Sequence, residues 1–226
     1  MKILAIDTST MMSSITIMED NRIIGDFSIS QEETHSEMLV PLVKRMLEDL
    51  KINLSEIDVY AVAKGPGSFT GLRIGVASIK AMAQVFDKPI IGISTLEAMA
   101  FSILNDNKIL SIIDARGKRY FTGLYQYVNG KLVCYFEDII QENKLMQIVE
   151  ENEKITIVGE AIGKLPDILK NSEKVVLAPA SLNNAIGRNL CVIAKQRFKS
   201  GEIESYFDIA PNYLRKSQAE VNLINK

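Results

Sequence analysis

The stretch at residues 64–75, which reads KGPGSFTGLRIG, constrains the fold of this chain more than any other segment. It follows an apolar run at residues 59–63, whose length and composition predict a buried strand. It leads into apolar residues with helical spacing, and the Gly-Pro-Gly segment at 65–67 favours a tight bend between the two. The sequence therefore predicts a strand, a glycine-rich turn and a helix at about residues 69–85, capped by Ser68 or Thr70.

Two interpretations of this turn are open. Unpaired backbone amides at a helix start can seat an anion, and the residues that would serve a phosphate are Gly65, Gly67 and Ser68. Alternatively, the glycines let two elements pack closely, and this is the interpretation that we favour. A Walker phosphate loop is excluded, because Leu72 follows Gly71 where such a loop needs lysine and then serine or threonine.

The helix after the turn combines small and apolar residues. Gly71 and Gly75 predict a smooth face that another backbone can approach, whereas Leu72, Val76 and Ile79 form an apolar stripe. We expect both glycines to face outward and the helix to act as a docking surface.

Composition excludes several classes of function. A net charge of -2 over 226 residues offers no basic field that could hold nucleic acid unaided. Two distant cysteines lack disulfide or zinc spacing, no secretory signal is evident, and no apolar run is long enough to cross a bilayer. We expect a cytoplasmic protein without a membrane partner.

The single histidine, His35, removes metal sites that need two histidines. One histidine is enough for a Ser-His-Asp catalytic triad, so a triad built on His35 remains an alternative. The sequence, however, contains no Gly-x-Ser-x-Gly nucleophile turn.

Apolar spacing predicts the same order of elements in both halves of the chain. Predicted strands lie at residues 2–6, 14–18, 23–29, 59–63, 90–93, 109–113, 120–127, 132–136, 155–158 and 175–177. Predicted helices lie at residues 34–51, 69–85, 95–104, 137–151, 161–169 and 181–198. This order predicts two similar α/β lobes at residues 1–105 and 106–211, with residues 212–226 packing back on the first lobe.

Two lobes that each start with a strand and a hairpin are the plan of the actin-like ATPase, sugar kinase and Hsp70 superfamily, a duplicated ribonuclease H-like fold. In that plan the end of the first strand faces a nucleotide, and Asp7, Thr8, Ser9 and Thr10 occupy the matching place. A carboxylate there can hold magnesium through water. The alternative is that Asp7 ends its strand and bonds to nearby amides.

Six motifs then appear in a characteristic order along the chain. They are ILAIDTS at residues 3–9, HSE at 35–37, GPGSFTGLRIG at 65–75, STLEA at 94–98, DAR at 114–116 and PNYLR at 211–215. Together they closely resemble the bacterial TsaB (YeaZ) family, and the match runs nearly end to end.

The resemblance implies a two-lobed, non-catalytic subunit needed for threonylcarbamoyladenosine in tRNAs that read codons beginning with A. It implies pairing with the paralogue TsaD, which carries the metal and transfers the threonylcarbamoyl group, and with the ATPase TsaE. It also implies a homodimer when the chain is alone, indirect contact with tRNA, and no cofactor of its own, since ATP and the metal belong to the partners. The paralogue holds its metal with two histidines, whereas this chain has only His35.

The resemblance also implies that the helices at residues 34–51 and 69–85 form the partner interface. Its expected residues are His35, Glu37, Met38, Leu42, Met46, Phe69, Gly71, Leu72, Arg73, Gly75, Val76 and Ile79. The alternatives are a glycoprotease-like peptidase and a stand-alone ATPase that uses Asp7.

Overall fold

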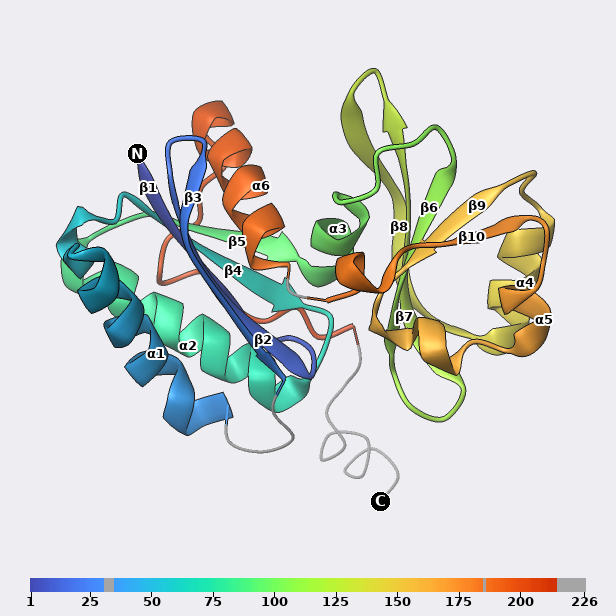
Figure 1. Cartoon of the computed structure of the whole chain (residues 1–226), viewed down its shortest axis with the longest axis horizontal. Coiled ribbons are helices and arrows are strands. Elements are labelled where there is room, and N and C mark those ends of the chain that lie inside the picture. The colour runs from blue at the N-terminus through green and yellow to red at the C-terminus, as the bar shows by residue number, and fades with distance from the viewer. Residues whose placement is uncertain (31–34, 185, 215–226) are drawn as a thin grey trace. The chain divides into compact units, whose positions relative to one another are not determined.

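The computed structural model describes residues 1–30, 35–184 and 186–214, with only the backbone described at residues 35–37. Two compact units make up the chain (Figure 1): Met1–Ala98 with residues 186–211, and Met99–Asn184 with residues 212–214. Each unit contains one five-stranded sheet and its own hydrophobic core.

The first unit contains a mixed sheet with the strand order β3-β2-β1-β4-β5. Its elements are β1 (Lys2–Asp7), β2 (Met12–Glu19), β3 (Arg22–Ser30), α1 (His35–Leu50), the 3-10 turn η1 (Leu54–Glu56), β4 (Val59–Gly65), α2 (Phe69–Phe86), β5 (Ile90–Ser94), the start of α3 (Thr95–Ala100) and α6 (Gly187–Ser200). Strands β1, β2 and β3 pair antiparallel, and β4 and β5 extend the sheet in parallel from β1. Helix α1 continues through Pro41.

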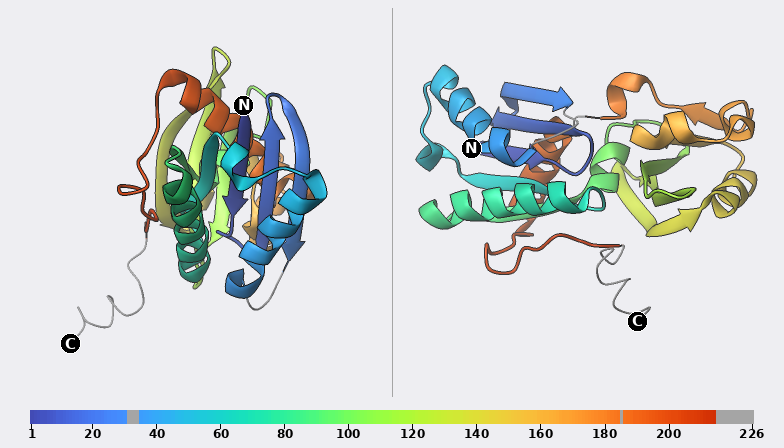
Figure 2. Two further views of the ribbon diagram at one scale, coloured as in Figure 1. Left: turned by 90° about the vertical axis from the view of Figure 1, so that its left-hand side faces the viewer. Right: turned by 90° about the horizontal axis from the view of Figure 1, so that it is seen from below.

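Alternate residues of this sheet face different helices. Leu4 and Ile6 of β1 belong to the core formed with α1 and α2. On the other face, Gly187 at the start of α6 lies so close to β2 that a Cβ there would stand 2.3 Å from Thr16 Oγ1. Figure 2 shows α1 and α2 side by side, with the sheet between them and α6. The first sheet is therefore covered on both faces, as its largely apolar strands require.

The second unit repeats the topology of the first, with the strand order β10-β9-β6-β7-β8. Its elements are β6 (Lys108–Asp114), β7 (Arg119–Val128), β8 (Lys131–Gln141), α4 (Glu142–Glu150), β9 (Ile155–Val158), the 3-10 turn η2 (Glu160–Lys164), α5 (Asp167–Lys170), β10 (Val175–Leu177) and the 3-10 turn η3 (Ala180–Leu182). Strands β6, β7 and β8 are antiparallel, and β9 and β10 are parallel to β6. The duplication predicted from element order is thus confirmed.

Residues 186–211 lie in a different unit from the one that we expected. The order of elements in the sequence predicts that residues 106–211 form the second lobe, but α6 packs on β1, β2, β4 and β5 of the first sheet. Arg197 of α6 donates from Nη2 to both carboxylate oxygens of Glu97 at 2.7 and 2.6 Å, and from Nη1 to the carbonyl of Gly92 at 2.9 Å. These contacts place the helix in the first unit. Residues 212–226 are also predicted to pack back on the first lobe, but the described residues 212–214 belong to the second unit, and residues 215–226 lie outside the described part of the chain.

Three predicted helices in the second half have different bounds. Residues 137–141 extend β8, because they pair with β7 through Ile140 opposite Tyr120, so α4 begins only at Glu142. Pro166 separates the predicted helix 161–169 into η2 and α5. The last helix begins at Gly187, six residues after the expected start at 181.

The hairpin between β7 and β8 has the predicted turn. Asn129 and Gly130 have φ values of 51° and 76°, and the Asn-Gly pair is favoured where both central residues of a two-residue turn need positive φ. None of the helices in the described ranges combines the length and apolar content that a bilayer span requires.

Candidate functional site

The glycine-rich turn joins β4 to α2 as predicted. Strand β4 ends at Gly65, which is linked to Pro66 by a cis peptide bond. Ser68 is the N-cap of α2, because its Oγ accepts a hydrogen bond from Gly71 N at 3.3 Å. Its own backbone N–H donates to the carbonyl of Ser9 at 2.6 Å. The turn therefore fastens the start of α2 to the chain that follows β1.

The polar residues after β1 are occupied by hydrogen bonds inside this unit. Asp7 is 1% exposed, and its Oδ1 accepts from the N–H and the hydroxyl of Ser9 at 2.8 and 2.5 Å. The Thr8 hydroxyl donates to the carbonyl of Gly71 at 2.6 Å, and the Thr10 hydroxyl bonds to the backbone of Met12. The predicted phosphate residues of both loops thus come together. The Thr8 hydroxyl and the hydrogen bond from Ser68 N to Ser9 O join the two loops, whereas the Ser9 and Thr10 hydroxyls bond within the loop after β1.

Gly67, Gly71 and Gly75 face inward, which corrects the expectation that Gly71 and Gly75 face outward. A Cβ on Gly71 would lie 1.9 Å from the carbonyl oxygen of Thr8, and one on Gly75 would lie 2.4 Å from Thr8 Oγ1. A Cβ on Gly67 would lie 2.2 Å from the carbonyl oxygen of Ser9. These glycines are required because the backbone of α2 passes directly over the loop after β1. The close-packing interpretation of the turn is the one that the geometry supports.

The apolar stripe of α2 is also internal. Leu72, Val76 and Ile79 are 1%, 3% and 0% exposed, and Val76 and Ile79 join the core under α1 and α2. A residue this deeply buried in one folded unit presents no surface to another protein. Five of the expected interface residues are therefore removed from the candidate interface: Gly71, Leu72, Gly75, Val76 and Ile79.

Lys64, the first residue of the glycine-rich motif, is held by the segment that follows α6. Its Nζ lies 3.0 and 3.3 Å from the carboxylate oxygens of Glu204, whose Oε1 also accepts from Gly92 N at 3.0 Å. Glu204 and Ile90 exchange both backbone hydrogen bonds, so this segment covers the outer edge of β5.

Replacing Glu204 by alanine is expected to lower the free energy of unfolding by about 1–2 kcal/mol, because Gly92 N and Lys64 Nζ lose a half-buried acceptor. Urea unfolding followed by circular dichroism measures the change. Glu202→Ala is the matched control, because Glu202 is exposed. Equal stability of the two variants would contradict the role of the Glu204 carboxylate.

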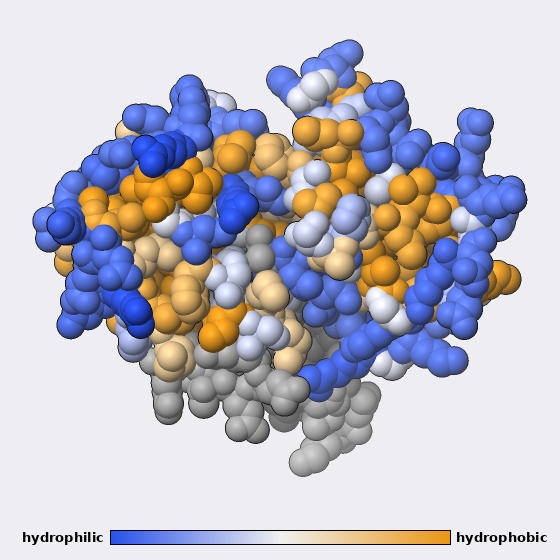
Figure 3. All heavy atoms as spheres, viewed as in Figure 1, coloured by the Kyte–Doolittle hydropathy of each residue, from blue (hydrophilic) through white to orange (hydrophobic). Residues whose placement is uncertain are grey.

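Helices α1 and α2 expose a second set of apolar side chains, which the sequence patterns did not single out. Val40 and Val85 are 59% and 72% exposed. With the exposed Pro41, Ala77 and Ala81 and the half-buried Ile74, they form what we call the α1–α2 face, whose residues are Val40, Pro41, Ile74, Ala77, Ala81 and Val85. Figure 3 shows apolar atoms gathered over these helices at the lower left. The sequence does contain a signal for this face, because the α2 positions on the side of the helix opposite the buried stripe are also apolar.

Five of the remaining expected interface residues have described side chains, and they lie on α1 and α2. Met38 is 40% exposed, and Leu42 and Met46 are half-buried on α1. Arg73 is exposed on α2, and its guanidinium lies 4.1 Å from the ring centroid of Phe69, at cation–π distance. The side chains of His35 and Glu37 lie outside the described part of the chain.

The second unit repeats the aspartate turn of the first. Asp114 ends β6, and its Oδ1 accepts from Arg116 N at 2.8 Å, as Asp7 accepts from Ser9 N. Partial burial alone would raise the pKa of Asp114, but the hydrogen bonds from Lys164 and Arg116 N outweigh it and hold this pKa below its usual value. Burial raises the pKa of the nearby Glu160. The same turn at both strand ends indicates a structural role for Asp7.

In the described ranges, 1–30, 35–184 and 186–214, no group of three or more histidine, cysteine, aspartate or glutamate side chains could hold a metal ion. The exposed apolar side chains of the α1–α2 face make this face the candidate functional site.

Comparison with known proteins identifies the family. The model of the TsaD family, described as tRNA N6-adenosine threonylcarbamoyltransferase, matches residues 22–223. The tRNA threonylcarbamoyladenosine biosynthesis protein TsaB of Bacillus subtilis (strain 168) is 31% identical over 229 residues, which cover 99% of this chain and 98% of the relative. Its Escherichia coli (strain K12) namesake is 31% identical over 240 residues, which cover the whole of both chains. The chain belongs to the TsaB family.

Solved structures of the TsaB (YeaZ) type and of sugar kinases share the fold of this TsaB-family chain. YeaZ from Pseudomonas aeruginosa aligns with a TM-score of 0.78 at 23% identity, covering 94% of this chain and 99% of that one. The ROK hexokinase of Thermus thermophilus aligns with a TM-score of 0.50 at 9% identity, covering 88% and 100%. The predicted actin-like fold is confirmed.

Proposed function

We propose that this chain is a subunit of the system that makes threonylcarbamoyladenosine in tRNA. The observation that carries the proposal is the full-length likeness, at 31% identity, to two relatives named as biosynthesis protein TsaB. In the proposed system the chain pairs with and activates the catalytic paralogue TsaD, together with the ATPase TsaE. The match to the TsaD family model fits a chain that shares its fold with that paralogue.

The proposed role is non-catalytic. The sequence contains one histidine, so it cannot by itself supply a metal site with two histidine ligands. The carboxylate of Asp7 accepts from the N–H and the hydroxyl of Ser9 within the β1 loop, and the hydroxyl of Thr8 donates to Gly71 O of α2. In this proposal the metal and ATP are bound by the partner proteins.

The α1–α2 face is the proposed contact surface for the paralogue. Two neighbouring helices with small exposed residues, such as Ala77 and Ala81, let the helices of a partner approach closely and complete a four-helix packing. Exposed valines at both ends add apolar area that gains free energy when it is covered. The same face serves a homodimer when the chain is alone. Contact with tRNA is made through the partner, since the net charge of this chain is only -2.

Depleting the chain from its native cell tests the proposal. Threonylcarbamoyladenosine is expected to disappear from tRNAs that read codons beginning with A, and re-expression of the chain is expected to restore it. Mass spectrometry of tRNA nucleosides measures the change, with pseudouridine as the internal control. An unchanged threonylcarbamoyladenosine content after complete depletion would refute the proposed function.

A further inference from the structure

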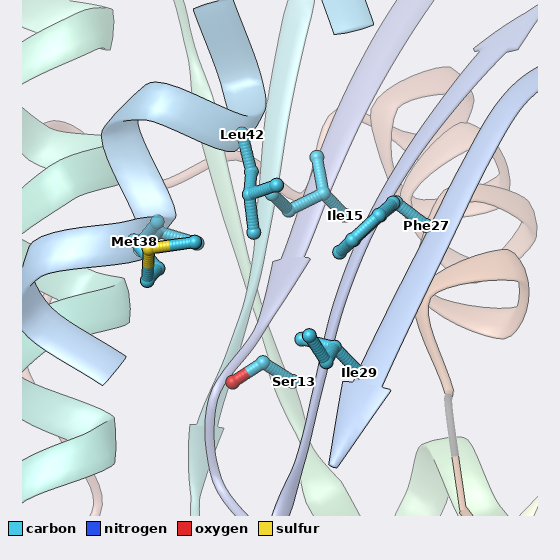
Figure 4. A pocket seen from close by; sticks show the side chains of 7 residues that line it. Ser13, Ile15, Phe27, Ile29, Met38 and Leu42 are labelled. Atoms are coloured by element: carbon cyan, nitrogen blue, oxygen red, sulfur yellow. The ribbon is translucent and has the colours of Figure 1, made fainter. Parts of the chain in front are cut away.

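The pocket beside helix α1 is too small to hold a ligand. It lies between Met38 and Leu42 of the helix and the strand residues Ile15, Phe27 and Ile29 (Figure 4). Its volume of about 10 Å³ is close to the minimum that one water molecule needs. The pocket is thus a packing gap of the first unit, whereas an exposed turn of the second unit has the chemistry of a binding site.

The turn between β6 and β7 concentrates positive charge. Residues 116–119 read RGKR, which places three cationic side chains within four residues, and we call this segment the basic turn. Its first three residues are exposed, and the last is half-buried. Among the described residues neither Arg116 nor Lys118 forms an ion pair, and the nearby carboxylate of Asp114 is paired with Lys164. The turn therefore presents positive charge to solvent.

The backbone conformation of the basic turn does not favour cationic residues. Arg116, Gly117 and Lys118 have φ values of 63°, 64° and 57°, which lie in the left-handed region. A residue with a Cβ adopts this region at a cost of about 1–2 kcal/mol, so glycine or asparagine is the less strained choice. At the other end of β7, where φ is also positive, the chain has Asn129 and Gly130. Strained residues of this kind are typical of functional positions, which indicates that the two cationic side chains have a role beyond forming the turn.

Hydrogen bonds hold the basic turn in this conformation. Asp114 Oδ1 accepts from Arg116 N at 2.8 Å, and Glu142 N donates to Lys118 O at 3.3 Å. Within the part of the chain that the structure describes, the backbone N–H groups of Gly117 and Lys118 donate no hydrogen bond, so both are available to an acceptor. Two backbone donors next to an arginine and a lysine form a donor set that suits the oxygens of a phosphate group.

We propose that the basic turn binds backbone phosphates of the tRNA on which the complex acts. The inference rests on the proposed function, which supplies the tRNA, and adds an RNA contact made by this chain itself. An open turn with exposed cations fits an extended polyanion better than a single nucleotide, because nucleotides are bound in clefts that enclose them. Since the net charge of -2 is too small to hold tRNA unaided, the turn supplements the RNA contacts of the paralogue within the complex.

Removing both exposed charges tests this inference. In the double variant Arg116→Gln with Lys118→Gln, the affinity of the chain–paralogue complex for tRNA is expected to fall about tenfold at about 0.15 M salt, because two phosphate contacts are lost. The slope of log affinity against log salt concentration is expected to become shallower by about 1 to 2. Fluorescence anisotropy of labelled tRNA over a series of salt concentrations measures both quantities.

The double variant Lys131→Gln with Lys154→Gln is the matched control, because it removes the same charge from the same unit. Both lysines are exposed and lie at the opposite end of the sheet from the basic turn, since Lys131 follows the turn after β7 and Lys154 precedes β9. Its complex is expected to bind tRNA like the unaltered one, and thermal unfolding verifies that both variants are folded. Equal tRNA affinity of both variants and the unaltered chain would overturn the inference, and so would an equal loss in the two variants.

A second measurement needs no substitution. In the complex, added tRNA is expected to protect Lys118 from acetylation, whereas acetylation of Lys154 is expected to stay unchanged, as mass spectrometry of the peptides measures. Failure of the unaltered chain to pair with the paralogue would refute the proposed function together with this inference. If the basic-turn variant instead lost affinity for the paralogue, or for ATP with tRNA binding unchanged, the turn would bind protein or nucleotide, and the RNA contact would be overturned.

Discussion

Replacing Gly71 by alanine is expected to lower the free energy of unfolding by about 3 kcal/mol or more, at the upper end of what overpacking costs. The added Cβ would lie 1.9 Å from the carbonyl oxygen of Thr8, which is backbone and cannot rotate away. Movement of α2 to relieve this contact would also break the hydrogen bond from the Thr8 hydroxyl to Gly71 O and the one from Ser68 N to Ser9 O. Urea unfolding followed by circular dichroism measures the loss.

Gly163→Ala provides the matched control for this substitution. No atom lies within 4 Å of a Cβ built at Gly163, so alanine there is expected to leave stability within about 0.5 kcal/mol or raise it slightly. Partner binding by Gly71→Ala is expected to fall only as far as the folded population falls. A stable, fully folded Gly71→Ala variant that had lost partner binding would restore the outward-facing interpretation of this glycine.

Placing arginine at Ala81 is expected to weaken pairing with the TsaD paralogue at least about 100-fold, which corresponds to about 2.7 kcal/mol. Ala81 is an exposed residue of the α1–α2 face, where a long charged side chain would hold the helices of a partner apart and bury a charge at the contact. Because the side chain points into solvent in the free chain, stability is expected to change by less than about 0.5 kcal/mol. Calorimetric titration measures the affinity.

Ala180→Arg is the control for Ala81→Arg, since Ala180 is also exposed but belongs to the second unit. It is expected to bind the paralogue like the unaltered chain. If Ala81→Arg paired with unchanged affinity, the α1–α2 face would not be the contact surface.

Much of the fold could be predicted from the sequence, because its strands are short, apolar and separated by strong turn signals. The Asn-Gly turn and the glycine-rich turn were both found where predicted. The start of α4 was missed, because Ile139 and Ile140 are compatible with either strand or helix and only pairing with β7 decides between them. The placement of α6 in the first unit depends on long-range contacts such as Arg197 with Glu97, which no local pattern shows.

The candidate site was predicted only in part. The sequence located the two helices, but it could not show which side of α2 is covered. Glycine at positions 71 and 75 is compatible with close approach on either side of a helix, and the structure places the loop after β1 there. The large apolar side chains of Leu72, Val76 and Ile79 are buried in the core, because they lie on one side of the helix. The surface that a partner can contact therefore lies on the opposite side, at Ala77 and Ala81.

A reconstituted transfer reaction tests the central claim most directly. Purified TsaD paralogue, TsaE, tRNA, ATP and a threonylcarbamoyl donor are combined with and without this chain, and threonylcarbamoyladenosine is counted by mass spectrometry. The account predicts that threonylcarbamoyladenosine forms only when this chain and the paralogue are both present. With the Ala81→Arg variant in place of the unaltered chain, little of it is expected to form. Formation of product by this chain without the paralogue, or full activity of the paralogue without this chain, would contradict it.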